Sequence, residues 1–315
     1  MRTIVVGIGV QGEKRCAVAG SDVVATVDPC RENVDYRSVA DVPLSDYDAA
    51  LVCVPDQAKE EILSHLLRHG KHVLVEKPLL FPDNKPLEHL AQTARANGAV
   101  CYTAYNHRFE PHFVRMRDLI AGGSLGQIYS VRMFYGNGTA RLVRNSPWRD
   151  QGAGVLPDLG SHLLDTLLFW LGDLAQTFEL WSANRFENQS FDHISFGAQA
   201  RDTLPLVQLE ATLLSWHNHF YCDVFAENGS AHITSLCKWG PSSFMVRHRV
   251  LPSGRPDEEV VTLSQPDPTW AIEYAHFCSL ASGDNPAEAG NIGNDMRINN
   301  ILNDIAARAF GGGGV

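Results

Sequence analysis

The first hundred residues alternate between short apolar runs and longer segments whose apolar side chains recur at helical spacing. Valine-rich runs at 3–8, 23–27, 49–54, 72–75 and 99–103 predict strands buried on both faces. Helices are predicted over 57–69, which ends at Gly70, and over 84–97, which ends at Gly98. Strands and helices that alternate in this way indicate an α/β fold with a doubly wound parallel sheet.

The pattern changes after Tyr105. A helix is predicted over 111–121, a strand with alternating polarity over 128–135, and a further helix over 157–171. Short strands dominate from 178 to 263, with a hairpin turn at Asn228-Gly229, and helices are predicted near 269–282 and 295–310 before a frayed glycine tail. Neighbouring strands predict an antiparallel or mixed sheet. We therefore expect two domains, 1–106 and 107–315.

Composition and charge narrow the classes of protein. The 315 residues carry 26 Lys+Arg against 36 Asp+Glu, a net charge of −10, and 44% are hydrophobic. This content is enough for two ordinary cores, and the acidic balance argues against a nucleic-acid or anionic-membrane partner. Seven scattered cysteines without a C-x-x-C pair predict reduced thiols and no zinc site. No metal is predicted elsewhere, because no complete set of ligands can be identified in the sequence. The apolar start is interrupted at Gly7, so no signal peptide is expected, and the protein is predicted to be cytoplasmic.

The glycine motif at the start of the chain predicts a dinucleotide site. Its G-x-G-x-x-G pattern follows a strand, opens a helix and comprises Gly7, Ile8, Gly9, Val10, Gln11 and Gly12. Such glycines permit a tight turn and let a pyrophosphate approach the helix N-terminus. Asp28 ends the second strand, where a carboxylate accepts hydrogen bonds from a ribose and repels a 2′-phosphate, so NAD is favoured over NADP. Arg31 nearby is a group that would soften this preference.

Two further motifs carry candidate chemistry. Lys77 follows the fourth strand, at the sheet edge where ligands bind, and Pro78 is a candidate cis-proline that would fix the direction of Lys77. Asp158, His162 and Asp165 lie at i, i+4 and i+7 of one predicted helix, opposite a leucine stripe. An imidazole and a carboxylate on one helix face suit a general base with an orienting acid. The same pattern is also expected for an Asp at the helix N-terminus with a buried structural His, or for half of a metal site.

The loop before this helix is rich in arginine. Arg141, Arg144 and Arg149 are suited to bind a phosphate or carboxylate, or to form structural ion pairs, and Trp148 is suited to stack on a sugar face. Farther on, the segment Trp216-His217-Asn218-His219 has the appearance of a metal or catalytic cluster. No supporting acid accompanies it, so we interpret it as sheet surface or subunit interface.

Taken together, these motifs resemble those of the Gfo/Idh/MocA oxidoreductases over nearly the whole chain. Val75-Glu76-Lys77-Pro78 resembles the family's E-K-P motif, the segment 158–165 its D-x-G-x-H-x-x-D motif, and Asn106-His107-Arg108-Phe109 its N-x-R-F segment. The resemblance implies a Rossmann domain followed by an α/β domain with a large, open, mostly antiparallel sheet. It also implies a homodimer or homotetramer formed through that sheet.

The resemblance further implies an NAD(P)-dependent dehydrogenase acting on CH–OH groups of a sugar, polyol or nucleotide sugar. His162 would be the general base, Lys77 would stabilise the reacting oxygen, and Asp158 would orient the substrate. The other residues predicted to bind the cofactor are Val54, Pro55, Gln57, Glu76 and Asn106, together with Lys77 itself. The predicted substrate residues, besides Asp158 and His162, are Arg108 and, from the composition of their loop, Trp148 and Arg149. A redox-neutral enzyme that retains NAD and a non-catalytic dinucleotide-binding regulator are the alternatives.

Overall fold

The computed structural model describes residues 1–173, 175–283 and 290–311. The chain divides into two compact units, Met1–Asn106 with Pro268–Asn300, and His107–Asp267 with Ile301–Val315. The first boundary follows Asn106, as expected, but the expected division placed all later residues in the second domain. The segment 268–300 belongs instead to the first unit, because its side chains pack in the core of that unit. The predicted glycine tail lies, beyond Gly311, outside the described residues.

A parallel sheet of five strands, in the order β2-β1-β3-β4-β5, forms the centre of the first unit. Every strand is hydrogen-bonded in parallel to its neighbours. The strand order reverses its direction between β1 and β3, and ligands of such sheets bind at this position. The strands are β1 (Thr3–Val6), β2 (Val23–Val27), β3 (Ala49–Val52), β4 (His72–Glu76) and β5 (Cys101–Ala104).

Helices cover both faces of this sheet, because successive strand residues point to opposite sides and nearly all are apolar. Ile4 and Val52 pack in a core with Leu63 of α2 and Leu90 of α3. Residues of the other parity pack with Phe277 of α7, which gives segment 268–300 its place in this unit. The helices are α1 (Val10–Ala19), α2 (Asp56–Arg68), α3 (Lys85–Ala96), α7 (Thr269–Ala281) and α8 (Ile292–Gly311). The doubly wound sheet is confirmed.

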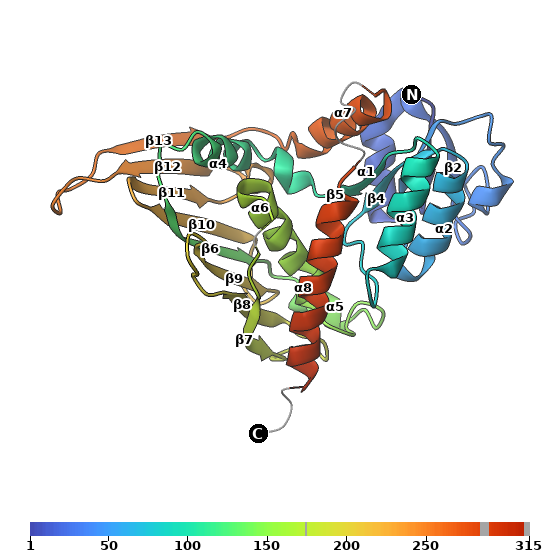
Figure 1. Ribbon diagram of the computed structural model, residues 1–315. Coiled ribbons are helices and arrows are strands. Elements are labelled where there is room, and N and C mark those ends of the chain that lie inside the picture. Colours follow the sequence, from blue (N-terminus) through green and yellow to red (C-terminus); the bar gives the residue numbers. More distant parts are fainter. Residues whose placement is uncertain (174, 284–289, 312–315) are drawn as a thin grey trace. The chain divides into compact units, whose positions relative to one another are not determined.

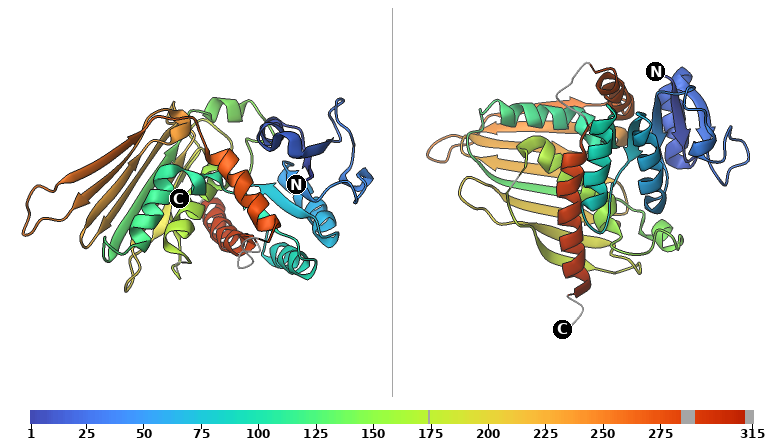
Figure 2. Two further views of the ribbon diagram at one scale, coloured as in Figure 1. Left: turned by 90° about the horizontal axis from the view of Figure 1, so that it is seen from above. Right: turned by 45° about the vertical axis from the view of Figure 1, so that its right-hand side comes forward.

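An eight-stranded sheet forms the second unit, in the order β13-β12-β11-β10-β6-β9-β8-β7. Its pairs are antiparallel except for β6 and β9, and Figure 2 shows the helices on one face only. The strands are β6 (Ile128–Gly136), β7 (Glu179–Asn184), β8 (His193–Ala198), β9 (Leu206–Thr212), β10 (His219–Ala226), β11 (Gly229–Thr234), β12 (Ser242–His248) and β13 (Glu258–Leu263). The predicted open, mostly antiparallel sheet is confirmed, including the turn at Asn228-Gly229.

The helices of this unit are α4 (Pro111–Ala121), the short α5 (Ala140–Arg144) and α6 (Ser161–Leu171). One expected helix differs from the structure. A single regular helix was predicted from Pro157, whereas Leu156–Gly160 forms a π-helical turn that α6 continues. The leucine stripe is buried at Leu159, Leu163 and Leu167, so packing fixes the position of the turn.

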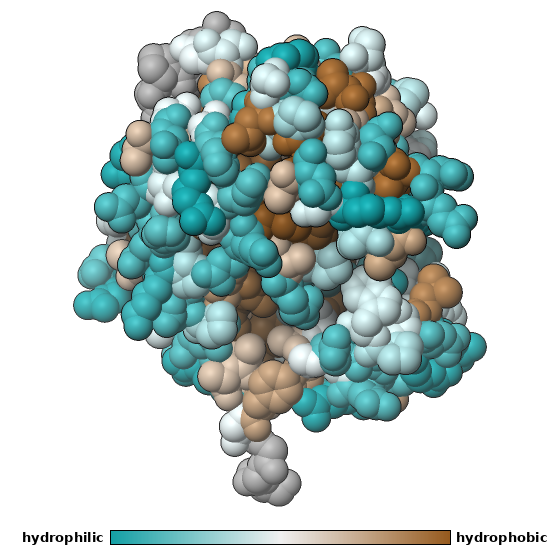
Figure 3. All heavy atoms as spheres, turned by 90° about the vertical axis from the view of Figure 1, so that its right-hand side faces the viewer, coloured by the Kyte–Doolittle hydropathy of each residue, from teal (hydrophilic) through white to brown (hydrophobic). Residues whose placement is uncertain are grey.

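The surface agrees with the acidic, mixed composition. On the face drawn in Figure 3, hydrophilic side chains predominate and hydrophobic ones form separate patches. Among the described residues, no helix is long and apolar enough to cross a membrane.

Candidate active site

The predicted site residues belong to both units. In the first unit, Gly7 has φ 90°, and a Cβ there would lie 2.6 Å from the carbonyl oxygen of Cys53. A Cβ on Gly12 would lie 2.0 Å from the carbonyl oxygen of Gly7, so α1 packs directly on the loop. The protein's own backbone therefore requires these two glycines.

Gly9 differs from its two neighbours in the motif. It is the N-cap of α1, its backbone is extended, and a Cβ there would meet open space among the described residues. No side chain caps the helix. The first N–H groups of a helix attract an anion, and the open space at Gly9 lets a pyrophosphate approach them. This part of the structure fits a dinucleotide, and the backbone of Val10 and Gln11 would contact it.

Asp28 follows β2 beside this loop. Its Oδ2 accepts a hydrogen bond from the N–H of Ile8 at 2.8 Å, and its Oδ1 accepts from those of Cys30 and Arg31. Burial raises the pKa of Asp28, but these three donors outweigh burial and lower it overall. The carboxylate is thus ionised and oriented, as a ribose ligand requires. The Arg31 Nε donates to the carbonyl of Ile8 at 3.0 Å, which places its half-exposed guanidinium beside the same loop.

The remaining predicted cofactor residues of this unit lie at the carboxyl ends of other strands. Val54 and Pro55 follow β3, Pro55 is the N-cap of α2, and Gln57 is exposed on the first turn of that helix. Asn106 is buried, and its Nδ2 donates to the Thr269 Oγ1 at 2.7 Å. Asn106 therefore joins the end of β5 to the start of α7, and its contact with a cofactor stays a prediction.

Glu76 ends β4 and is held by a buried cation that the sequence did not reveal. The guanidinium of Arg15 lies 2.7 Å from the Glu76 Oε1 and 2.7 Å from the Glu273 Oε2, and the Arg15 side chain is 1% exposed. The indole of Trp270 lies 4.3 Å from the same guanidinium. Arg15 thus links the glycine-motif helix, the strand that precedes Lys77, and α7.

A second buried cation fixes the turn after Lys77. The Lys77–Pro78 peptide bond is cis, as expected, and the carbonyl of Pro78 accepts a hydrogen bond from the Lys59 Nζ at 2.6 Å. The Lys59 Nζ also lies 2.7 Å from the Asp56 Oδ1, and burial lowers the pKa of Lys59. The backbone on both sides of Lys77 is therefore tied to neighbouring elements, which limits where its half-buried side chain points.

In the second unit, His162 belongs to a cluster of polar side chains. It is 7% exposed, and its ring stacks on that of His107 with the centroids 4.0 Å apart. The Lys238 Nζ lies 3.1 Å from the His107 Nε2 and 3.4 Å from the Tyr135 Oη. Because an ammonium group only donates, the His107 Nε2 and the Tyr135 Oη are the acceptors.

Asp158 lies in the π-helical turn, before His162, and is partly buried. Burial raises the pKa of Tyr135, and the negative charge of Asp158 acts in the same direction. The ring centroids of Tyr135 and His162 lie 5.9 Å apart, so the structure brings these two side chains together, whereas the contact of Asp158 with His162 stays a prediction. His107, Tyr135 and Lys238 were not predicted as site residues; only the alternation of 128–135 marked Tyr135 as an inward-facing strand position.

Arg108 and Asp165 form a buried, bidentate ion pair. The Arg108 Nη2 lies 2.6 Å from the Asp165 Oδ1, its Nε contacts both carboxylate oxygens, and Asp165 is 1% exposed. Burial raises the pKa of Asp165, while Arg108 acts in the opposite direction. The last acid of the D-x-G-x-H-x-x-D motif therefore orients Arg108, whose predicted contact with substrate stays a prediction.

The segment that carries Lys238 is anchored by Glu110. The N–H of Cys237 donates to the Glu110 Oε1 at 3.1 Å, and the Cys237 thiol donates to its Oε2 at 2.8 Å. Glu110 is 2% exposed, and burial raises its pKa. This carboxyl group directly precedes α4 and fixes the short helical turn Cys237–Trp239.

The arginine-rich loop is ordered by Asp150. Its carboxylate accepts hydrogen bonds from the N–H groups of Gln189 and Ser190. Trp148 is 70% exposed, and Arg149 is exposed beside it. Arg141 lies 3.4 Å from the Glu187 carboxylate, which matches the ion-pair alternative for that arginine. Within the described part of the chain, no cluster of His, Cys, Asp and Glu is arranged to hold a metal ion.

Comparisons with known proteins identify the family to which both parts of the chain belong. Residues 1–105 match the family model described as "Oxidoreductase family, NAD-binding Rossmann fold", and residues 113–232 match the "GFO/IDH/MocA C-terminal domain". The first match defines an NAD-binding protein of the oxidoreductase class. With the second, the chain belongs to the Gfo/Idh/MocA family, and the resemblance seen in its motifs is confirmed.

Individual relatives are similar over part of their length. An uncharacterized oxidoreductase of Schizosaccharomyces pombe is 31% identical over 145 residues, which are 44% of this chain and 38% of the relative. D-glucoside 3-dehydrogenase of Escherichia coli is 32% identical over 134 residues, which are 40% and 36% of the two chains. The match thus spans less than half of these curated relatives. A crystal structure of an inositol dehydrogenase homologue with NAD+ from Azotobacter vinelandii shares the fold, with a TM-score of 0.80, 20% identity, and coverage of 100% of this chain and 96% of that one.

Proposed function

We propose that this protein is an NAD-dependent dehydrogenase that oxidises a secondary alcohol of a sugar, a polyol or a nucleotide sugar. The observation that supports it most is the buried His162, whose ring stacks on that of His107 and which follows Asp158 by four residues in consecutive helical turns. A buried imidazole suits the removal of a hydroxyl proton. Relatives that act on glucosides and inositol make a sugar-like alcohol the natural substrate class.

His162, Lys77 and Asp158 have separate roles in the proposed reaction. When bound, NAD supplies a nicotinamide ring that accepts hydride from the carbinol carbon. His162 takes the hydroxyl proton of that carbon, and stacking on His107 fixes the plane of its ring. Lys77 donates a hydrogen bond to the same oxygen and stabilises its alkoxide character, since an ammonium group favours developing negative charge. Asp158 accepts a hydrogen bond from a neighbouring hydroxyl and orients the substrate.

The test is NADH appearance with a panel of inositols, free sugars, uronates and UDP-sugars. Lys77→Ala and His162→Gln are expected to abolish turnover while calorimetry shows NAD affinity largely unchanged. Lys85→Ala, at a side chain 87% exposed, and the exposed His89→Gln are the matched controls and should retain full turnover. Unchanged turnover in either site variant contradicts its assigned role. No signal from any substrate, with NAD bound, contradicts the dehydrogenase and supports the redox-neutral or regulatory alternative.

We also propose a cytoplasmic homodimer or homotetramer that assembles through the face of the eight-stranded sheet opposite its helices. Aromatic side chains collect there. Phe134 and Tyr221 stack with ring centroids 5.2 Å apart, and Phe225, which alternates onto the same face, is 48% exposed. Apolar rings on an open face suit burial against a second copy. Light scattering of the purified protein that gave a monomer mass would contradict this assembly.

A further inference from the structure

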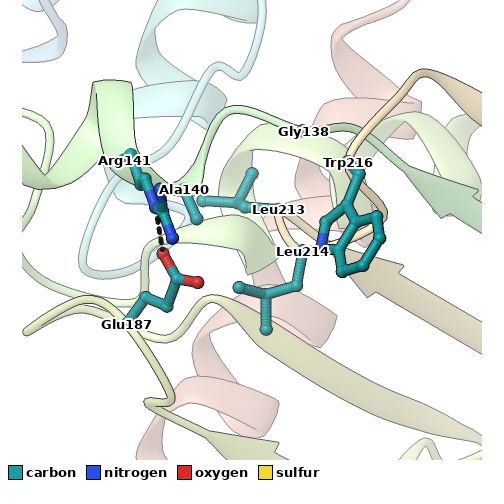
Figure 4. A pocket seen from close by; sticks show the side chains of 7 residues that line it. All are labelled: Gly138, Ala140, Arg141, Glu187, Leu213, Leu214 and Trp216. Carbon is teal, nitrogen blue, oxygen red and sulfur yellow. Dashed lines mark hydrogen bonds and ion pairs between the residues drawn. The ribbon is translucent and has the colours of Figure 1, made fainter.

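A cavity of about 300 Å³ lies in the second unit, beside the loop that joins β9 to β10. Figure 4 shows the indole of Trp216 on one side of it and the Arg141–Glu187 ion pair on the opposite side, with Leu214 between them. Gly138, Leu213 and Ala140 complete the lining. None of the predicted catalytic residues lines this cavity, which has no role in the proposed chemistry.

Trp216 occupies a position that the packing of the fold does not explain. Its side chain is 93% exposed, and its φ is 62°, in the left-handed region that large side chains rarely adopt. An exposed indole gives up the stabilisation that burial would bring, and the left-handed backbone adds a further cost. Folding alone would place a small or polar residue here, so a ligand is the better explanation for the tryptophan.

The opposite backbone is adapted to this conformation. A Cβ on Gly138 would lie 2.3 Å from the carbonyl oxygen of Trp216, so only glycine lets the two segments approach so closely. Gly138 follows β6, and Trp216 precedes β10, the strand that pairs with β6. The exposed indole is therefore set in place by two neighbouring strands rather than by one mobile loop.

The chemistry of the lining selects the ligand. The indole and the leucine side chains offer apolar surface, whereas the guanidinium donates hydrogen bonds and the carboxylate accepts them. Because Arg141 and Glu187 carry opposite charges, the cavity favours a neutral ligand that has one apolar face and several hydroxyl groups. Its volume is at the lower end of the range for small-molecule sites, which suits one ring.

We infer that this cavity binds a sugar ring, with the C–H face of the ring on Trp216 and its hydroxyl groups on Arg141 and Glu187. Gly138 is three residues beyond Tyr135, which contacts His162, so the Cα atoms of Gly138 and Tyr135 lie at most about 11 Å apart. This places the cavity near the candidate site within the same unit. If the proposed function holds, the substrate has a second, non-reacting sugar unit, and this cavity binds that unit.

Binding is measured without turnover, so that it is independent of the proposed function. Saturation-transfer NMR in the absence of NAD, with glucose, cellobiose and maltose as probes, should show binding of a disaccharide to the wild-type protein. Trp216→Ala should weaken this binding about tenfold, the usual value of an aromatic contact of this kind. Trp216→Phe should retain most of it, and Glu187→Gln should weaken it without changing the melting temperature.

The control is Tyr129→Ala, which removes another exposed aromatic ring at the start of β6, on the strand parity opposite to Phe134. Equal binding by wild type and Trp216→Ala, or no binding of any probe by the wild type, overturns the inference. A change in the mass of Trp216→Ala in light scattering, with sugar binding unchanged, overturns it in favour of contact with a second copy. If a disaccharide is also oxidised, Trp216→Ala should raise its KM about tenfold and leave kcat unchanged. Failure of oxidation alone contradicts the proposed function and leaves the binding result standing.

Discussion

Replacing Arg15 with methionine is expected to destabilise the first unit by about 4 kcal/mol. Arg15 is 1% exposed and pairs at 2.7 Å with Glu273, which is fully buried, and with Glu76, which is 14% exposed. Removing one partner of a buried network costs about 3–5 kcal/mol, because the remaining charges stay buried without compensation. Methionine retains the apolar stem of the side chain but loses the guanidinium, which contacts both carboxylates and the ring of Trp270.

The loss of unfolding free energy in Arg15→Met should be measured by urea unfolding followed by circular dichroism, with and without NAD. A ligand stabilises only the unit that binds it, so the transition that NAD shifts reports the first unit.

A matched control lies in the same unit. Arg2 pairs with Asp48 at the same distance, 2.7 Å, but the two side chains are 53% and 43% exposed. Arg2→Met should cost less than about 1 kcal/mol, because water screens an exposed pair. The triple variant Arg15→Met, Glu76→Gln, Glu273→Gln should recover more than half of the loss. A cost for Arg15→Met no greater than that for Arg2→Met would refute the reasoning.

Three further outcomes are expected. Gly9→Ala should leave the melting temperature unchanged and weaken NAD binding in calorimetry. Gly12→Ala should instead lower the free energy of unfolding by about 2 kcal/mol, because its Cβ would lie 2.0 Å from a carbonyl oxygen. Equal effects of the two variants on stability would contradict this difference. Asp28→Ala should weaken NAD and narrow its advantage over NADP in titrations, and an unchanged ratio would exclude Asp28 as the ribose ligand. Backbone donors lower the pKa of Asp150 against the opposing effect of burial, so this carboxylate stabilises the protein above about pH 4 and loses that effect as the pH falls. Asp150→Asn should be less stable than wild type at neutral pH and show a shallower loss on acid denaturation.

Much of the first unit was predictable because its signals are local. Each strand is apolar on both faces, and Gly70 and Gly98 mark the ends of the helices that cover one of them. The other face was only partly predictable. Besides α1 it is covered by α7, which comes from a segment more than 150 residues beyond β5, and nothing in the first hundred residues indicates which later helix will pack there.

The candidate site divides in the same way. Asp158 and His162 share one short motif, so their proximity follows from the chain itself. Lys238 lies 131 residues from His107 and 103 from Tyr135, and only tertiary contacts, such as those of Glu110 with Cys237, bring these residues together. The π-helical turn at Leu156–Gly160 was missed, because it depends on packing and not on the propensities of its residues.

The discontinuous first unit has a consequence for synthesis on the ribosome. All five strands of the parallel sheet emerge by residue 104, yet the face on which α1 packs is completed only when α7 follows. Arg15 likewise has no Glu273 to pair with until that later segment is made. The Thr103 hydroxyl also gains the Asp295 carboxylate, which accepts its hydrogen bond, only then. The nascent sheet therefore exposes apolar surface while residues 107–267 are being made, which makes this unit a natural client for chaperones that bind growing chains.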